Sequence, residues 1–279
     1  MPIVGFQGIP GAYSEMAANK VFEGQSYKLK GFPSFEKIFR ALETKKIDFG
    51  IIPIENSLAG SIHENYDHLL NHRVWISGEY YLRVKHSLLA PPGAKLKTIK
   101  KVYSHPQALG QCAGFLKDNK MEPIPFFDTA GSAKLVSEKE DTSVAAIAGA
   151  HAADDYNLSV VRSSIEDDHQ NYTRFFVVQA KSRKAKPVAK TTKAKTSIVF
   201  SLKNVPGGLH KSLSVFAIRD IDLMKIESRP LKGSPWKYLF YLDFSGSLRD
   251  EAVARCLEHL SEITQMIKVL GSYPKAQTK

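Results

Sequence analysis

The run Asn171-Tyr172-Thr173-Arg174-Phe175-Phe176 places a hydroxyl and a guanidinium at the start of an apolar strand. An arginine that enters such a strand needs an anionic partner, because an unpaired buried charge costs several kcal/mol. One candidate partner is the acidic loop Glu166-Asp167-Asp168, which precedes it in sequence. The other is a bound carboxylate, which would make Arg174 a carboxylate-binding fork beside the Thr173 hydroxyl.

Four more polar loops lie next to predicted strands. Each one alone is typical of a helix cap. The first also carries glycines that permit a tight turn and a helix end that offers free N–H groups to an anion. Together with Thr173-Arg174, the four favour a polar cleft between two lobes. Their sequences are Gly8-Ile9-Pro10-Gly11-Ala12-Tyr13-Ser14-Glu15, Ile52-Pro53-Ile54-Glu55-Asn56-Ser57, Ser104-His105-Pro106-Gln107 and Asp128-Thr129-Ala130-Gly131-Ser132.

Metal and thiol chemistry are weighed against simpler interpretations. His63, His68 and His72 have a spacing that would suit a metal, but helix surfaces often carry such spacing, and we predict no metal site. Cys112 and Cys256 fit no Cys-x-x-Cys pattern and are interpreted as small core residues. We expect neither a disulfide nor a reactive thiol, because nothing near Cys112 in sequence would lower its pKa.

The elements that position these loops alternate as in an α/β protein. Ligands of such proteins lie beyond the carboxyl ends of strands, where the polar loops fall. The patterns predict strands at 3–6, 49–54, 102–104, 144–148 and 175–178, an extended stretch at 75–89, and helices at 13–22, 35–44, 62–70, 107–117 and 131–138.

The last third of the chain has a different order. Strands at 197–202, 223–228, 238–244 and 267–270 surround two amphipathic helices, one with Leu209, Leu213 and Phe216 on a single face and one with Val253, Leu257 and Leu260. This is the βαββαβ order of a ferredoxin-like α+β domain, which by itself fixes no function.

The net charge of +11 on 279 residues is concentrated in one segment. Residues 181–195 carry seven lysines and arginines and no acid, which leaves +4 for everything else. Because the segment lacks aromatic and periodic apolar residues, we interpret it as a solvated linker and expect no nucleic-acid partner. The chain has no apolar run long enough to cross a bilayer and no signal peptide, so we expect a cytoplasmic protein and no membrane partner.

Taken together, the four loops and Thr173-Arg174-Phe175 resemble the prephenate dehydratase family, and the likeness runs from Ile3 to Tyr273 apart from the linker. The C-terminal part resembles the regulatory ACT domain of that family, with Glu227-Ser228-Arg229-Pro230 matching its phenylalanine-site motif. One departure is Gly207-Gly208-Leu209-His210, where the family commonly has Gly-Ala-Leu and then an apolar residue. We expect His210 to alter the affinity for the effector.

The resemblance implies a carbon–oxygen lyase that converts prephenate to phenylpyruvate in L-phenylalanine biosynthesis, without metal or organic cofactor. Thr173 corresponds to the family's catalytic threonine and would donate to the leaving hydroxyl. Arg174 and the helix end from Gly11 to Ser14 are candidates for the substrate carboxylates. The substrate-binding set as a whole is Gly11, Tyr13, Ser14, Glu55, Asn56, Ser57, Ser104, His105, Gln107, Thr129, Ser132, Arg174 and Phe175.

The resemblance also implies feedback inhibition by L-phenylalanine in a homodimer or homotetramer assembled through the ACT and catalytic domains. The expected effector residues are Asn204, Gly207, Gly208, Leu209, Glu227, Ser228, Arg229 and Pro230.

The implied architecture is a catalytic domain at 1–180 with two α/β lobes, like type II periplasmic binding proteins, whose chain crosses near 76 and returns near 170. The linker at 181–195, the ACT domain at 196–273 and a tail at 274–279 follow. No helical pattern precedes Ile3, so no fused chorismate mutase is expected. Two alternatives remain open: arogenate dehydratase, whose substrate is the amino analogue of prephenate, and a non-catalytic amino-acid-sensing or solute-binding protein.

Overall fold

The computed structural model describes residues 1–181, 193–231, 233–234 and 236–276. The chain forms two compact units, and each unit is assembled from three separate stretches. Unit 1 comprises Met1–Ile38, Ile51–Ile62 and Tyr81–Phe175, and unit 2 comprises Phe39–Gly50, His63–Tyr80 and Phe176–Lys279.

The first sheet of unit 1 has the strand order β11-β3-β1-β2, with β1 and β2 parallel. The centre of this sheet is strongly apolar, because Ile51, Ile52 and Ile54 on β3 and Phe6 on β1 are all buried. Strands β3 and β11 and helix α2 continue into unit 2. The elements are β1 (Ile3–Gln7), α1 (Tyr13–Val21), β2 (Lys28–Phe32), α2 (Phe35–Glu43), β3 (Phe49–Asn56), β4 (Gly60–Ser61) and β11 (Tyr172–Ala180).

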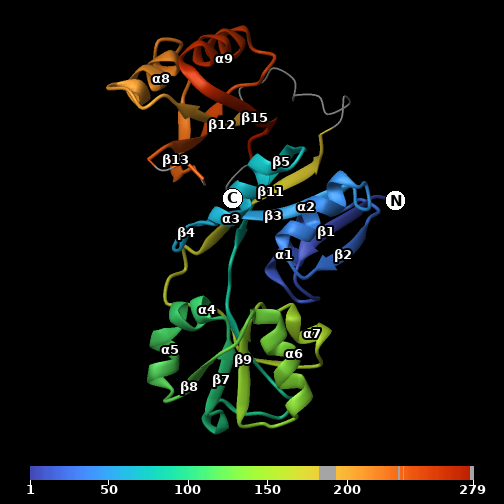
Figure 1. Cartoon of the computed structure of the whole chain (residues 1–279). Coiled ribbons are helices and arrows are strands. Elements are labelled where there is room, and N and C mark those ends of the chain that lie inside the picture. The colour runs from blue at the N-terminus through green and yellow to red at the C-terminus, as the bar shows by residue number, and fades with distance from the viewer. Residues whose placement is uncertain (182–192, 232, 235, 277–279) are drawn as a thin grey trace. The chain divides into compact units, whose positions relative to one another are not determined.

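The second sheet of unit 1 has five strands in the order β10-β6-β9-β7-β8. Strand β7 runs parallel to β8 and β9, and β6 runs antiparallel to β9 and β10. Helices α4 and α5 lie on one side of this sheet and α6 and α7 on the other (Figure 1). The elements are β6 (Ser87–Ala90), η1 (Leu96–Thr98), β7 (Lys101–Ser104), α4 (Pro106–Gln111), α5 (Ala113–Asp118), β8 (Glu122–Pro125), α6 (Thr129–Lys139), β9 (Val144–Ala148), α7 (Ala152–Asp155) and β10 (Ser159–Arg162).

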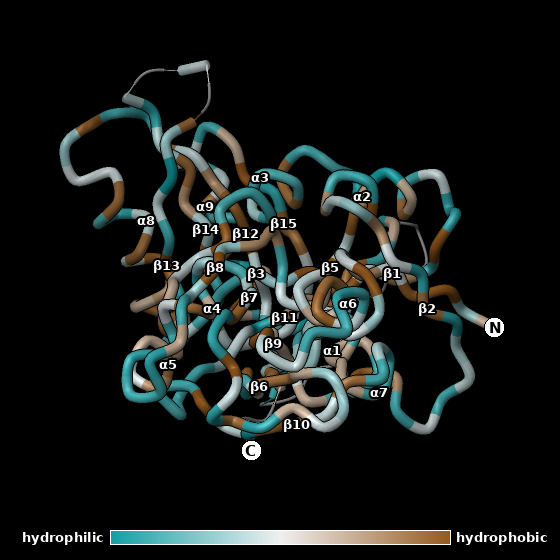
Figure 2. Tube along the Cα trace, turned by 90° about the horizontal axis from the view of Figure 1, so that it is seen from below, coloured by the Kyte–Doolittle hydropathy of each residue, from teal (hydrophilic) through white to brown (hydrophobic). Residues whose placement is uncertain are grey.

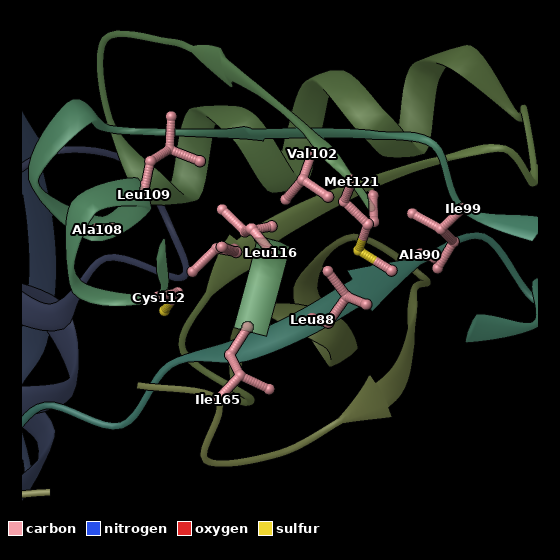
Figure 3. Packing of buried hydrophobic residues seen from close by; sticks show 12 residues of the cluster. Leu88, Ala90, Ile99, Val102, Ala108, Leu109, Cys112, Leu116, Met121 and Ile165 are labelled. Carbon is pink, nitrogen blue, oxygen red and sulfur yellow. The ribbon is translucent and has the colours of Figure 1, made fainter. Parts of the chain in front are cut away.

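One apolar cluster fixes α4 and α5 against this sheet. Leu109, Cys112 and Leu116 on the helical segment pack with Leu88 and Val102 on the strands (Figure 3). The single helix predicted over 107–117 is in fact two helices, because the backbone at Cys112 leaves helical geometry, with φ −121° and ψ 21°. This packing holds Gln111 at the end of α4.

The predicted crossing to the second lobe near 76 is too early. Strand β5 (Val74–Arg83) runs on to Arg83, and β6 begins only at Ser87. The return is closer to the prediction, since it falls between Arg162 and Tyr172. The structure therefore has two α/β lobes joined by two crossing segments.

The last six elements follow the predicted βαββαβ order. They form an antiparallel sheet in the order β13-β14-β12-β15, and the helices pack through Phe216, Val253 and Leu260. The elements are β12 (Ala194–Leu202), α8 (Gly208–Ala217), β13 (Leu223–Pro230), β14 (Tyr238–Ser245), α9 (Glu251–Ile263) and β15 (Thr264–Pro274).

Unit 2 also contains α3 (His63–Asn71), which the predicted domain boundaries assigned to the catalytic part. Polar contacts hold this helix to the C-terminal sheet. The Lys268 Nζ donates to the carbonyl oxygens of Leu69, Leu70 and His72 at 2.9, 2.6 and 2.9 Å, and so satisfies carbonyls at the end of the helix. The Tyr241 hydroxyl donates to the Tyr66 carbonyl at 3.0 Å.

The predicted linker at 181–195 is partly corrected. Lys195 belongs to β12, where it is 3% exposed and its Nζ lies 2.7 Å from the Glu79 Oε1. It is thus an internal ion-pair partner and not a solvated linker charge. Residues 182–192, where most of the predicted linker falls, lie outside the described residues.

Hydrophobic and hydrophilic residues alternate in short stretches along the trace (Figure 2). In the described part of the chain, no helix is both long enough and apolar enough to span a membrane.

Candidate active site

A cavity of about 320 Å³ lies within unit 1 and is lined by strand residues of the first sheet and by loop and helix residues that flank the strands of the second sheet. Eight of the predicted site residues line it: Tyr13, Ser14, Asn56, His105, Gln107, Thr129, Thr173 and Phe175. The other lining residues are Gln7, Phe35, Pro53, Val84, His86, Ala108, Gln111 and Asp128.

Thr173 presents a hydroxyl group to the cavity. Its Oγ1 accepts a hydrogen bond from the Asn56 Nδ2 at 3.1 Å, and Thr173 is 9% exposed. The Asn56 Oδ1 accepts from the backbone N–H groups of Leu58 and Ala59 at 3.0 and 2.9 Å, which fixes the orientation of the amide. Because Asn56 can only donate to Thr173, the Thr173 O–H is left to donate to a bound molecule.

Arg174 does not line the cavity. Successive side chains of a strand point to opposite faces, so Thr173 and Phe175 face the cavity and Arg174 faces away. Its Nη1 lies 3.9 Å from the Glu55 Oε2, and its guanidinium stands over the Tyr81 ring at 6.0 Å. Glu55 is thus a carboxylate partner of Arg174 that the sequence analysis did not predict. Glu55 itself does not line the cavity either.

Three predicted serines have structural contacts instead of lining the cavity. The Ser57 hydroxyl donates to the Gln170 carbonyl at 2.7 Å and accepts from the Tyr172 N–H at 2.9 Å, which ties β3 to β11. The Ser104 hydroxyl donates to the Ile147 carbonyl at 2.6 Å, between β7 and β9. The Ser132 hydroxyl donates to the Asp128 carbonyl at 2.7 Å, in the first turn of α6.

Gly11 shapes the first loop without reaching the cavity. Its φ of +84° favours glycine, and a Cβ there would lie 2.8 Å from the Ala152 Cβ. Its N–H donates to the Glu15 Oε2 at 2.7 Å, so this donor is not available to a ligand.

Helices α1, α4 and α6 all begin at the cavity, where Ser14, Gln107 and Thr129 are lining residues. Helix N-termini carry partial positive charge and unpaired N–H groups, which favour anions. No lysine or arginine is among the lining residues, so neutral donors and helix ends would have to hold an anionic ligand.

Two lining residues that the sequence analysis missed, His86 and Gln111, connect Tyr13 to the Asn56 side of the cavity. The Tyr13 hydroxyl lies 2.9 Å from the His86 Nδ1, and the His86 Nε2 lies 2.9 Å from the Gln111 Oε1. Gln111 could have been found from its spacing, since it lies one helical turn beyond Gln107. Burial raises the pKa of the Tyr13 hydroxyl well above its usual value, so the group stays protonated. Its single hydrogen has two acceptors, the Lys85 carbonyl oxygen at 2.8 Å and the His86 Nδ1.

We expect the free energy of unfolding to decrease as the pH falls below about 6.5, the pKa of histidine in unfolded chains. Burial lowers the pKa of His86 in the folded protein, and the hydrogen bond to Gln111 and the Glu166 charge oppose this shift only in part. Between the lowered pKa of His86 in the folded protein and about 6.5, the unfolded state therefore binds more protons than the folded state. The free energy of unfolding rises as the pH rises through this range.

Urea denaturation at pH values between about 5 and 7.5 measures this effect. His86→Gln should make the dependence on pH shallower than in the wild type, while carboxylates contribute equally to both proteins. If the free energy of unfolding depends on pH equally steeply in both proteins, His86 does not contribute to that dependence.

The other candidate groups take structural roles. Burial, followed by the nearby Asp167 and Glu166 charges, raises the pKa of the Cys112 thiol far above its usual value. The rings of His68 and His72 stack on Phe39 at 5.1 and 5.3 Å. Among the described residues, no cluster of three or more His, Cys, Asp or Glu could hold a metal ion.

A second cavity lies in the βαββαβ part of unit 2. Of the predicted effector residues, Asn204, Gly207, Gly208 and Leu209 line it, together with His210, Trp236 and Tyr238. The motif Glu227-Ser228-Arg229-Pro230 is not among its lining residues but lies on β13. There the Arg229 Nη2 lies 3.2 Å from the Asp67 Oδ2, and the Glu227 Oε2 lies 3.6 Å from the Lys225 Nζ.

The fold and the site define a two-lobed α/β protein with a polar cavity to which Thr173 presents a hydroxyl. The model of the prephenate dehydratase family matches residues 4–183. The chain belongs to the prephenate dehydratase family, which is a family of dehydratases.

Known proteins resemble nearly the whole chain. A curated relative is the arogenate dehydratase/prephenate dehydratase 1 of Arabidopsis thaliana, named chloroplastic, which is 43% identical over 97% of this chain and 71% of its own length. The crystal structure of a prephenate dehydratase from Arthrobacter aurescens in complex with L-Phe is 28% identical, with a TM-score of 0.90 over 98% of this chain and 90% of that one. A structure described as GqqA, a novel type of quorum quenching acylase, is 31% identical, with a TM-score of 0.91 over 98% of both chains.

Proposed function

We propose that the protein is a prephenate dehydratase that forms phenylpyruvate for L-phenylalanine biosynthesis. Membership of the family supports this activity, and the observation that carries the mechanism is the Asn56 to Thr173 hydrogen bond, which leaves the Thr173 O–H as a donor toward the cavity.

In the proposed reaction, the bond between the ring and its carboxylate breaks and carbon dioxide leaves. The electron pair forms a ring double bond, the carbon–oxygen bond of the ring hydroxyl breaks, and the departing oxygen leaves as water after it takes up a proton. Thr173 donates a hydrogen bond to that oxygen. Because a threonine hydroxyl is a weak acid, positioning and electrostatic stabilisation must supply much of the rate acceleration.

We propose that the substrate carboxylates are held by the starts of α1, α4 and α6 and by side-chain donors such as Gln107 and Thr129, all of which line the cavity. Arg174 does not contact the substrate in this proposal. It stabilises β3 through its ion pair with Glu55, which does not line the cavity.

Arogenate is the alternative substrate, since the A. thaliana relative is named for both activities. Competition assays with both substrates present would measure the ratio of the two kcat/KM values. A higher value for prephenate supports the proposal, and a higher value for arogenate would make the protein an arogenate dehydratase.

The similarity to the acylase structure does not lead us to propose amide hydrolysis. A hydroxyl or thiol nucleophile requires a base within hydrogen-bond reach. Among the described lining residues, His86 contacts Tyr13 and Gln111, and the His105 Nδ1 accepts from the Gln107 N–H at 3.2 Å. In the described part of the chain, neither histidine has a hydrogen bond to a serine, threonine or cysteine side chain.

We further propose that the C-terminal domain is an ACT domain that binds L-phenylalanine as a feedback inhibitor. Support comes from the βαββαβ order, from the aromatic and basic cavity in unit 2, and from the A. aurescens structure in complex with L-Phe. The cytoplasmic location and the homodimer or homotetramer stay predictions, which cell fractionation and sedimentation can test.

We expect turnover to fall as L-phenylalanine is added, and we expect D-phenylalanine, the matched control ligand, to have little effect. His210 lines the effector cavity where the family commonly has an apolar residue. His210→Leu should therefore lower the L-phenylalanine concentration for half-inhibition by about fivefold, the equivalent of about 1 kcal/mol of apolar contact. A rate that does not respond to L-phenylalanine in either protein would remove the regulatory role.

A further inference from the structure

Six polar side chains form one continuous series of hydrogen bonds around the cavity, and their directions can be worked out one after another. The series begins at Thr173 and ends at Tyr13. Its members in order are Thr173, Asn56, Asn171, Gln111, His86 and Tyr13.

The backbone sets the first direction. Because the Asn56 Oδ1 accepts from two backbone N–H groups, the Asn56 NH2 must be the group that faces Asn171. The Asn56 Nδ2 lies 2.7 Å from the Asn171 Oδ1, so this oxygen is the acceptor. The Asn171 NH2 then faces the Gln111 Oε1 at 3.1 Å and donates to it.

These directions determine the tautomer of His86. The Gln111 Oε1 can only accept, so the His86 Nε2 at 2.9 Å must carry a proton. A neutral imidazole has one N–H, so the His86 Nδ1 is bare and can only accept from the Tyr13 hydroxyl at 2.9 Å, whose single hydrogen it shares with the Lys85 carbonyl oxygen at 2.8 Å. His86 is 2% exposed, so these partners are not replaced by solvent.

The Gln111 amide is the group that this arrangement orients. Its oxygen receives two hydrogen bonds, from His86 and Asn171, while its NH2 has no acceptor among the described residues and belongs to a cavity-lining side chain. We propose that His86 is a positioning residue, held as the Nε2–H tautomer, that directs the Gln111 NH2 toward the substrate. This role rests on the dehydratase function proposed above.

Two substitutions separate the two contacts of His86. Glutamine can place an amide N–H near the position of the imidazole Nε2, so His86→Gln keeps the donor to Gln111. Asparagine can place an acceptor near the position of the Nδ1, so His86→Asn keeps the contact with Tyr13 and loses the one with Gln111. We expect kcat/KM to fall by about 10- to 100-fold in His86→Asn and by about threefold or less in His86→Gln.

Equal losses in the two variants would contradict the proposal, because they would mean that His86 acts only by filling space. Thermal unfolding of both variants verifies that they are folded.

A second measurement does not depend on the activity of the variants. Nitrogen NMR of the wild-type protein labelled in histidine reports which ring nitrogen carries the proton, and the His86→Gln variant assigns the His86 signals. We expect the His86 Nε2 to be protonated and the Nδ1 to be bare near pH 7.5. A proton on the His86 Nδ1 alone would overturn the inference even if the enzyme is active. A wild-type protein that converts neither prephenate nor arogenate would instead overturn the proposed function, and the NMR result would still decide the tautomer.

Discussion

Thr173→Ala should lower kcat by about 10²-fold or more, because it removes the hydroxyl that we propose donates a hydrogen bond to the leaving oxygen. The fold should survive. The Asn56 Nδ2 keeps the Asn171 Oδ1 at 2.7 Å and the Tyr172 carbonyl at 3.2 Å as acceptors, so the expected loss of stability is about 1 kcal/mol. Steady-state assays with prephenate and circular dichroism measure the two effects.

Thr173→Ser is the matched control, since it keeps the hydroxyl and removes only a methyl group. It should retain most of the turnover. If the alanine variant works nearly as well as the wild type, Thr173 has no part in the chemistry.

Lys195→Met should lower the free energy of unfolding by about 3–5 kcal/mol, because it removes a buried cation from contact with the buried Glu79 carboxylate. The Lys195 Nζ lies 2.7 and 2.9 Å from the two Glu79 oxygens, and the side chains are 4% and 0% exposed. A typical domain is stable by only about 5–15 kcal/mol, so the effect should be large in urea denaturation.

Lys20→Met provides the comparison, since Lys20 pairs with Glu23 at 3.1 Å and both side chains are at least half exposed. Its expected effect is below about 1 kcal/mol. Adding Glu79→Gln to Lys195→Met should restore part of the lost stability, because the remaining partner is then neutral. If Lys195→Met costs no more than Lys20→Met, the Glu79 ion pair does not stabilise the fold.

The sequence was most informative where one pattern determines one element. Val144–Ala148 is a strand with the predicted bounds, because a short run of small and β-branched residues buried on both faces fits little else. The βαββαβ order is also confirmed, because two amphipathic helices of clear period separate its strands. Strands β2 and β8 were missed because lysine and proline interrupt their apolar pattern.

The site was only partly predictable because sequence spacing does not tell which way a side chain points. Thr173 and Arg174 are neighbours in sequence, yet the alternation of a strand that begins at Tyr172 sends them to opposite faces. Lys195 looked like a linker residue because its partner Glu79 is 116 positions away. His86 carries no motif, and only the folded chain brings it to Gln111.

The most direct test of the account is to supply the purified protein with prephenate and follow phenylpyruvate, with Thr173→Ala measured in parallel at equal concentration. The account predicts steady formation of phenylpyruvate by the wild type and a rate at least about 10²-fold lower in the variant. A folded wild-type protein that forms phenylpyruvate no faster than the variant would contradict it.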